Sequence, residues 1–425
     1  MPMQSFTFVH AADLHLGAPF KGLDSSAADV FPLAEASFAA LANLEKLCIE
    51  KNAAFLILSG DIYDDKDGVL RARFALRDMF ARLEKEGIRV FFAHGNHDPY
   101  KTAKLPVTWP GNVTVFSPEV SCERVMRNGE AFALVQGISH AKTAETANLS
   151  LKFKADASES IFQIAVLHCA VGGAGEGHAP YAPCTLTDLT EAGFDYWALG
   201  HVHQGRVLSE KPWVVYPGSF QGMHINETGN HGAAVVTVTD GAADVETVPL
   251  APVAWRKIIA DVTDVETVDA LENAVTSALA NEVAAVVAEN PEAKTVFCRV
   301  VLRGRTSLDP MLQKRAELAA FLERTRAEFS GSLPVWVKDI VAETKPLRDT
   351  SALLERSDLV GEVARIAADA PLAAEVAGAA LAPFASHQKL KKALADSSLF
   401  AMKDDEAAAL ANAAKSLLIS LLEDE

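Results

Sequence analysis

Five apolar runs of this chain each end in a short cluster of Asp, His, Asn and Gly, and this repeated pattern constrains the fold most. The runs are Phe6–Ala12, Ala53–Ser59, Ile88–Ala93, Ile161–Leu167 and Asp195–Leu199. An apolar run followed by a polar loop is typical of a buried strand in an α/β fold, which carries functional groups at the carboxyl ends of its strands. Carboxylate, imidazole and carboxamide groups gathered from several strands are suited to a two-metal site. We therefore expect such a site here.

The clusters supply seven candidate metal ligands, and these are Asp13, His15, Asp61, Asn96, His168, His201 and His203. Residues two apart on an extended chain point to the same side, so we expect Asp13 with His15 and His201 with His203 to face one way. Asp61 can bridge two cations about 3.5–4 Å apart, and Gly60 lets the backbone turn without a Cβ clash. Each cluster alone is ordinary, since Asp-X-His is common in surface turns and a single buried His is usually a hydrogen-bonded core residue. All five occurring in order at strand ends favours a metal site.

Residues 1 to about 245 alternate between predicted strands and helices. Apolar side chains at helical spacing predict helices over Pro32–Lys51 and Leu70–Glu86, the second closed by Gly87. Short strand-to-helix connections favour βα units and a largely parallel or mixed sheet. Trp213–Tyr216 and Ala233–Val238 follow as strands with no helix between them, which predicts antiparallel pairing on that side.

Three domains are expected, covering residues 1–248, 249–345 and 346–425. The second, which follows a Pro-marked connector, is predicted as a small α+β cap with strands over 255–262, 295–302 and 335–341 and helices over 265–280 and 310–326. The third is predicted to be helical, and Pro371 and Pro383 divide it into short pieces. Its apolar positions are Leu359, Val363, Ile366, Leu417, Leu418, Leu421 and Leu422. Such helices either dock on the body of the protein, closing its own core, or contact a partner.

Composition limits the class of protein and its compartment. The formal net charge of −17 over 425 residues opposes nucleic-acid binding by the chain alone, because such proteins usually carry a basic patch. Five unpatterned Cys fit reduced thiols packed in a cytoplasmic protein and not zinc ligands. We expect no signal peptide and no membrane span, because the N-terminus lacks a basic and apolar leader and no uncharged apolar stretch is long enough.

The ordered set Asp-X-His, Gly-Asp-X-X-Asp, Gly-Asn-His-Asp, His and Gly-His-X-His resembles the calcineurin-like metallophosphoesterase superfamily. Four further segments resemble its bacterial DNA repair exonuclease branch, the SbcD-like and YhaO-like proteins, and they are Phe8–Gly17, Pro19–Leu23, Gly177–Cys184 and Pro217–Gly229. The resemblance is strong over residues 6–240 and weaker beyond. It implies an α/β fold, in which a metallophosphoesterase β-sandwich flanked by helices is joined to a small α+β cap domain and a helical C-terminal region.

The resemblance also implies roles for individual residues. One metal ion would be held by Asp13, His15, Asp61 and His203, and a second by Asp61, Asn96, His168 and His201. His97 would protonate the leaving oxygen, and Asp64 would orient the His97 ring. The acid role agrees with the chemistry of the pair, because a neighbouring carboxylate favours a charged imidazole. The alternative for Asp64 is a helix N-cap before Leu70–Glu86. Hard oxygens with imidazoles suit Mn²⁺, Mg²⁺, Fe²⁺ or Zn²⁺, and the resemblance favours Mn²⁺.

The expected activity is two-metal-dependent hydrolysis of DNA phosphodiesters in DNA repair, as an exonuclease and also as a single-strand endonuclease. The resemblance implies a dimer and an SbcC-like coiled-coil ATPase that docks on the C-terminal helices. His178, Tyr181 and His224 are candidate substrate contacts, while Met223 stands where related sequences predict a basic residue. Two rivals stay open: a small-molecule or nucleotide phosphodiesterase or phosphatase with the same dinuclear site, and a non-catalytic subunit of the ATPase.

Overall fold

The computed structural model describes residues 4–23, 27–64, 69–100, 107–172, 180–347 and 350–368. The chain divides into two compact units. The first contains residues 1–262, 266–304 and 311–344, and the second contains residues 263–265 and 305–310 with the described residues after 344. Within the described ranges, no helix is both long enough and apolar enough to pass through a lipid bilayer.

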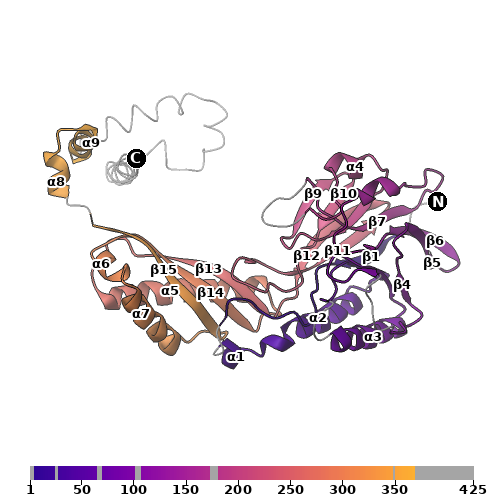
Figure 1. Ribbon diagram of the computed structural model, residues 1–425, viewed down its shortest axis with the longest axis horizontal. Helices are drawn as coiled ribbons and strands as arrows, with labels where there is room; N and C mark the ends of the chain where they lie inside the picture. The colour runs from indigo at the N-terminus through magenta and orange to yellow at the C-terminus, as the bar shows by residue number, and fades with distance from the viewer. Residues whose placement is uncertain are drawn as a thin grey trace. The chain divides into compact units, whose positions relative to one another are not determined.

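Two six-stranded sheets form the N-terminal part of the first unit (Figure 1). The first sheet has the order β12-β11-β1-β2-β3-β4, with bounds Ala242–Pro249, Gly232–Thr239, Phe6–Ala11, Phe55–Ser59, Arg89–Ala93 and Val113–Val115. The second has the order β5-β6-β7-β8-β10-β9, with bounds Ser121–Arg127, Glu130–Gly137, Phe162–His168, Tyr196–Gly200, Trp213–Tyr216 and Arg206–Glu210. Both sheets are mixed, and the predicted α/β sandwich is confirmed.

The five strands that precede the polar clusters are divided between the two sheets. Strands β1, β2 and β3 pair in parallel in the first, and β7 and β8 pair in parallel in the second. The antiparallel prediction is confirmed for β11, which pairs antiparallel with β1. It is only half right for β10, which pairs antiparallel with β9 but parallel with β8.

Aromatic and aliphatic side chains fill the space between the two sheets. Phe8 and Phe55 stack with ring centroids 4.9 Å apart, and Tyr196 of the second sheet meets Phe8 edge-on at 5.2 Å. These side chains are fully buried and belong to one continuous core. Because β2 is covered on both faces, its first four residues are all apolar and do not alternate with polar ones.

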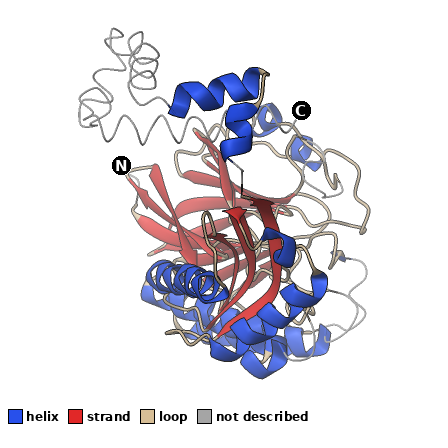
Figure 2. Cartoon of the chain, turned by 90° about the vertical axis from the view of Figure 1, so that its left-hand side faces the viewer, coloured by secondary structure: helices blue, strands red, loops and turns tan. Residues whose placement is uncertain are grey.

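Helices α2 (Ala36–Glu50) and α3 (Val69–Lys85) pack against the outer face of the first sheet. Figure 2 shows the helices in blue and the strands in red. Leu41, Leu44 and Leu76 join a second core against the first sheet. A capping box of Thr185 and Asp188 begins α4, where the sequence predicted no helix. The helical segments of this part are α1 (Ala27–Val30), a 3₁₀ turn (Leu33–Glu35), α2 (Ala36–Glu50), α3 (Val69–Lys85), a 3₁₀ turn (Leu149–Lys152) and α4 (Leu186–Thr190).

The next segment forms a three-stranded sheet in the order β13 (Val253–Asp261), β14 (Thr295–Thr306) and β15 (Val335–Pro346). Helix α5 (Val268–Glu289) runs nine residues beyond the predicted end at Ala280, because the buried positions of its apolar face continue to Val286. The predicted single helix over 310–326 is two helices, α6 (Asp309–Leu312) and α7 (Arg315–Glu328).

Two helices follow in the second unit, α8 (Thr350–Glu355) and α9 (Leu359–Ala368). The sequence placed Leu359 on the apolar face of α9, but it is 63% exposed, and Val360 and Ala364 instead pack with Leu353. The predicted Leu cluster at 417–422 and the two helix-breaking prolines lie outside the described residues. Of the five free Cys, four are buried as predicted, whereas Cys122 is exposed.

Candidate metal centre

The loops after five strands bring the predicted ligands of both sheets together. Donor atoms of Asp13, His15 and His203 lie within 4.8 Å of one another, and so do those of Asp13, Asp61 and His168. Asp13 therefore belongs to both groups. Asp13 and His15 follow β1, Asp61 follows β2, His203 follows β8, and His168 is the last residue of β7. The site therefore lies where the carboxyl ends of strands from the two sheets meet.

The second group extends to a carboxamide. Nε2 of His168 lies 3.0 Å from Oδ1 of Asn96 and 3.3 Å from Oδ2 of Asp61. Three donor atoms that converge in this way on a buried point could share one cation. His201 is close by, since its ring centroid lies 5.3 Å from that of His168, and its backbone N–H donates to the Asp13 carboxylate at 2.9 Å.

The backbone at four of the predicted ligands is left-handed. The φ angles are 50° at Asp13, 42° at His15, 51° at Asp61 and 105° at His201. The expectation of extended chain at Asp13 and His15 is therefore wrong, because β1 ends at Ala11 and both residues lie beyond it with positive φ. Non-glycine residues in this region cost about 1–3 kcal/mol each, and such strain is concentrated at functional sites.

Glycines beside the ligands allow the loops to approach one another closely. A Cβ at Gly60, where φ is +91°, would lie 2.5 Å from Nδ1 of His168. A Cβ at Gly95 would overlap the Asp61 carboxylate, and one at Gly200 would overlap the backbone of Ser59. Glycine at position 60 therefore allows the backbone turn, as the sequence predicted, and it also leaves room for the His168 ring, which the sequence did not reveal.

Hydrogen bonds orient the imidazoles so that their Nε2 atoms remain available. Nδ1 of His168 donates to the carbonyl of Ser59 at 2.9 Å, and Nδ1 of His15 lies 3.0 Å from Oδ1 of Asp64. Nε2 of His15 is buried and has no hydrogen-bond partner among the described residues. A buried imidazole nitrogen is rarely left unpaired, so this atom fits a metal ligand.

His97 and Asp64 lie at the edge of the cluster. Nδ1 of His97 is 2.8 Å from Oδ1 of Asp64, the same oxygen that faces His15, and the backbone N–H of His97 donates to Asp61 at 2.8 Å. The hydrogen bond with Asp64 raises the pKa of His97. The His97 side chain is 48% exposed, so it can reach a substrate oxygen. These contacts favour the orienting role of Asp64 over the helix N-cap.

Neighbouring charges set the protonation of the buried ligands. Burial alone would raise the pKa of Asp61, but the nearby His168 imidazole lowers it well below its usual value. Burial would lower the pKa of His168, but the attraction of Asp61 raises it to about 9. Burial raises the pKa of Asp13. The cluster thus holds ionised oxygen that a divalent cation would neutralise.

Of the three candidate substrate contacts, Tyr181 and His224 lie beside residues of the site, and the third falls outside the described residues. The Tyr181 ring meets His201 edge-on with centroids 5.8 Å apart, and Nε2 of His224 lies 3.4 Å from the Glu227 carboxylate. His178 lies outside the described residues.

Glu227 was missed by the sequence analysis. It contacts His203 with Oε1 only 2.7 Å from Nδ1. It lies within the Pro217–Gly229 segment, but a single Glu in a loop carries no spacing signal.

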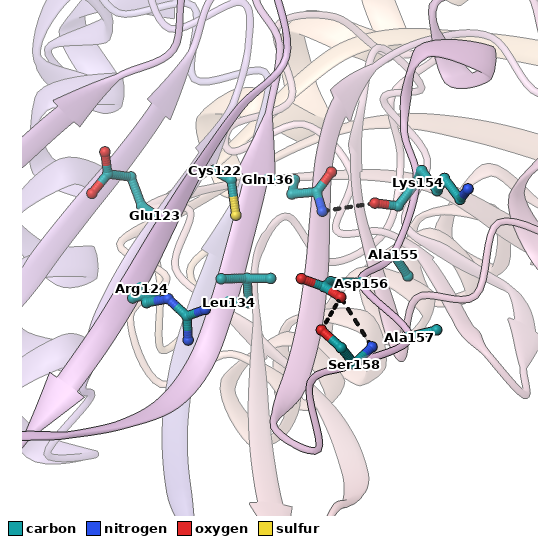
Figure 3. Close-up of a pocket in the computed structure, with 10 residues that line it drawn as sticks. All are labelled: Cys122, Glu123, Arg124, Leu134, Gln136, Lys154, Ala155, Asp156, Ala157 and Ser158. Atoms are coloured by element: carbon teal, nitrogen blue, oxygen red, sulfur yellow. Dashed lines mark hydrogen bonds between the residues drawn. The ribbon is translucent and has the colours of Figure 1, made fainter.

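A separate groove of about 830 Å³ borders β5 and β6 (Figure 3). Gln136 donates to the Lys154 carbonyl at 2.9 Å, and Asp156 accepts from the backbone and hydroxyl of Ser158. Glu123 and Arg124 pair with Arg89 and Glu159, which lie outside the groove. None of the predicted site residues lines it. The groove therefore offers no catalytic constellation.

Comparison with known proteins follows the same division of the chain. Residues 6–205 match the calcineurin-like phosphoesterase family, and residues 255–345 match the middle domain of the metallophosphoesterase YhaO. The chain is 37% identical over 272 residues to the uncharacterized metallophosphoesterase YhaO of Bacillus subtilis. The aligned region covers 63% of this chain and 66% of that protein.

More distant relatives are DNA double-strand break repair proteins. Mre11 of Methanocaldococcus jannaschii is 27% identical over 240 residues, covering 52% of this chain and 58% of that protein. Mre11 of Methanococcus maripaludis is 26% identical over 208 residues, covering 46% and 51%. The matched region spans less than two thirds of the length of each of these relatives and of YhaO.

Proposed function

Since this chain belongs, through residues 6–205, to the calcineurin-like phosphoesterases, we propose that it hydrolyses DNA phosphodiesters at a site of two divalent cations. The observation that carries this proposal is the convergence of carboxylate, carboxamide and imidazole donors from loops of both sheets. The buried and unpartnered Nε2 of His15 supports it, because a cation is the partner that this atom lacks.

Two overlapping ligand sets are proposed. Asp13, His15, Asp61 and His203 would hold one ion, and Asp61, Asn96, His168 and His201 the other. When bound, two divalent cations lower the pKa of an attacking water and stabilise the charge that develops on the phosphate. Mn²⁺ is proposed because the donors are oxygen and imidazole nitrogen without thiolate, and Mg²⁺, Fe²⁺ and Zn²⁺ satisfy the same donors.

His97 is the proposed general acid. Departure of an alkoxide needs a proton, and an imidazole whose charged form is stabilised by a carboxylate carries one near neutral pH. The Asp64 carboxylate supplies this stabilisation at 2.8 Å and also fixes the direction of the ring. Because Asp64 contacts His15 as well, one carboxylate would orient a metal ligand and the acid together.

DNA is proposed as the substrate because relatives of this chain are DNA double-strand break repair proteins. Cleavage would be exonucleolytic, with single-strand endonuclease activity in addition. Tyr181 would stack on a base, and His224 would contact a phosphate. The segment matching the YhaO middle domain would select strand or end geometry as a cap.

The proposal extends to partners and compartment. An SbcC-like coiled-coil ATPase would dock on the C-terminal helices and supply the basic surface that a chain of net charge −17 lacks. A homodimer is proposed as the working form. Five free Cys support a reducing cytoplasm, where disulfides are rare.

The net charge favours one alternative, a phosphodiesterase or phosphatase for nucleotides or other small molecules, because such substrates need no extended basic surface. An assay on end-labelled single- and double-stranded DNA with Mn²⁺ separates the two functions when nucleotide esters are tested in parallel. We expect DNA cleavage that chelator abolishes and that rises when the ATPase is added. Rapid hydrolysis of nucleotide esters with no cleavage of DNA would overturn the DNA assignment.

A further inference from the structure

Glu227 lies in the loop between β10 and β11, and its carboxylate contacts the proposed ligand His203. Oε1 of Glu227 is 2.7 Å from Nδ1 of His203, and Oε2 accepts a hydrogen bond from the backbone N–H of Met223 at 2.6 Å. The Glu227 side chain is only 13% exposed. Both of its oxygens are therefore engaged inside the protein, and one of them faces the metal centre.

Two other imidazoles of the cluster, His15 and His168, are held in the same manner. Nδ1 of His15 faces a carboxylate oxygen of Asp64, and Nδ1 of His168 donates to the carbonyl of Ser59. An oxygen at Nδ1 fixes the tautomer in which Nε2 carries the free electron pair. Histidines that bind metals almost always have such an outer partner, and its loss typically weakens metal binding about 10–100-fold.

The loop that carries Glu227 is hydrogen-bonded to strand β13 through Gln221 and Gly222. Nε2 of Gln221 donates to the carbonyl of Val253 at 2.8 Å, and Oε1 of Gln221 accepts from the backbone N–H of Val253 at 3.2 Å. Nε1 of Trp255 donates to the carbonyl of Gly222 at 2.8 Å. These groups are buried, so the loop that carries Glu227 follows β13 closely.

Two further histidines contact Glu227. Nε2 of His224 lies 3.4 Å from Oε1 of Glu227, and Nε2 of His231 lies 3.0 Å from the Glu227 carbonyl.

We propose that Glu227 is a positioning residue, which holds His203 with its Nε2 free for a divalent cation and ties this ligand to strand β13. The inference rests on the proposed function, since it needs a cation at His203. It adds a residue that is no metal ligand itself and a physical connection between the metal centre and the segment that matches the YhaO middle domain.

The test compares Mn²⁺ binding by Glu227→Ala, Glu227→Gln and a control, Glu246→Ala, in the full-length chain. The control removes a carboxylate that is 62% exposed on β12. We expect Glu227→Ala to bind Mn²⁺ about 10–100-fold more weakly than wild type. Glu227→Gln should lose less, because its carboxamide oxygen still accepts from Nδ1, and Glu246→Ala should bind as wild type does. Titration calorimetry gives affinity and stoichiometry.

A thermal unfolding scan of each metal-free variant separates positioning from folding. If Glu227→Ala unfolds early, Glu227→Gln decides the test, and its Mn²⁺ affinity must lie below that of wild type while its metal-free melting temperature stays close. Wild-type Mn²⁺ affinity in Glu227→Ala would overturn the inference and leave the proposed function standing. Failure of the wild-type chain to bind Mn²⁺, Mg²⁺, Fe²⁺ or Zn²⁺ would overturn both.

Discussion

Replacing Asp64 with Asn tests the acid role of His97 through its pH dependence. His97 must be protonated to donate a proton, so activity should be present at low pH and fall as pH rises through the His97 pKa. The Asp64 carboxylate raises that pKa. Asp64→Asn keeps the shape of the side chain and removes the charge, so the fall should occur at lower pH.

The energy of the contact follows from the geometry of the pair. Opposite charges 4 Å apart attract by about 1 kcal/mol in water and about 4 kcal/mol at an effective dielectric constant of 20. The His97 and Asp64 side chains are 48% and 29% exposed, so the attraction lies near the lower limit, about 1 kcal/mol. Loss of this attraction favours the neutral imidazole, so the basic limb of the profile should move to lower pH.

The assay is the kcat/KM of DNA hydrolysis between pH 6 and 10 at saturating Mn²⁺. Asp78→Asn is the matched control, because it removes an equal charge from an exposed position on α3. Its profile should coincide with that of wild type. His97→Ala should lose about 10²–10⁴-fold in rate together with the basic limb. An Asp64→Asn profile that ends at the wild-type pH, or at a higher one, would refute the reasoning.

Three further predictions concern the metal centre and its loops. Gly60→Ala should lower the free energy of unfolding, measured in urea titrations, by about 1–3 kcal/mol more than Gly87→Ala does. Both glycines have positive φ, but only at Gly60 would a Cβ meet another side chain. Equal losses of stability would contradict this prediction. Mn²⁺ at 100 times its Kd should raise the free energy of unfolding by about 2.7 kcal/mol. Addition of a chelator should therefore lower the melting temperature, and an unchanged melting temperature would count against a bound ion. Asp61→Asn should lose both ions in a Mn²⁺ titration, and retention of two would exclude the bridging role.

The sequence predicted which side chains converge better than it predicted the sheets. Each of the five site-bearing strands is an apolar run that ends in a distinctive polar cluster, and both features are local. That β3 belongs to one sheet and β7 to the other depends on pairing between distant segments, which a single sequence does not show. Strands such as β5 are largely exposed and carry few apolar residues, so they gave no signal.

The reasoning about the ligands was wrong where it relied on regular geometry. Donor atoms of Asp13 and His15 do lie within 4.8 Å of one another, but both residues have left-handed backbone, so alternation along an extended chain is not the cause. Outer partners of the imidazoles were beyond prediction for a different reason. Ser59 acts through its carbonyl and Glu227 through a loop, and neither use leaves a pattern in the residue types.

Helix ends depended on whether a stop signal was present. Gly87 marked the end of α3 correctly, whereas α5 continues through Asn281 because its buried apolar positions persist to Val286, and it ends before the C-cap residue Asn290. The domain boundaries, the partner-docking role of residues 346–425 and the individual catalytic roles stay predictions.

The most direct test of the account is an anomalous-difference map from crystals of the wild-type chain grown with saturating Mn²⁺. The account predicts two peaks about 3.5–4 Å apart, with the Asp61 carboxylate between them, His15 and His203 at one peak and His168 and Asn96 at the other. A single peak, or peaks that do not share Asp61, would contradict it.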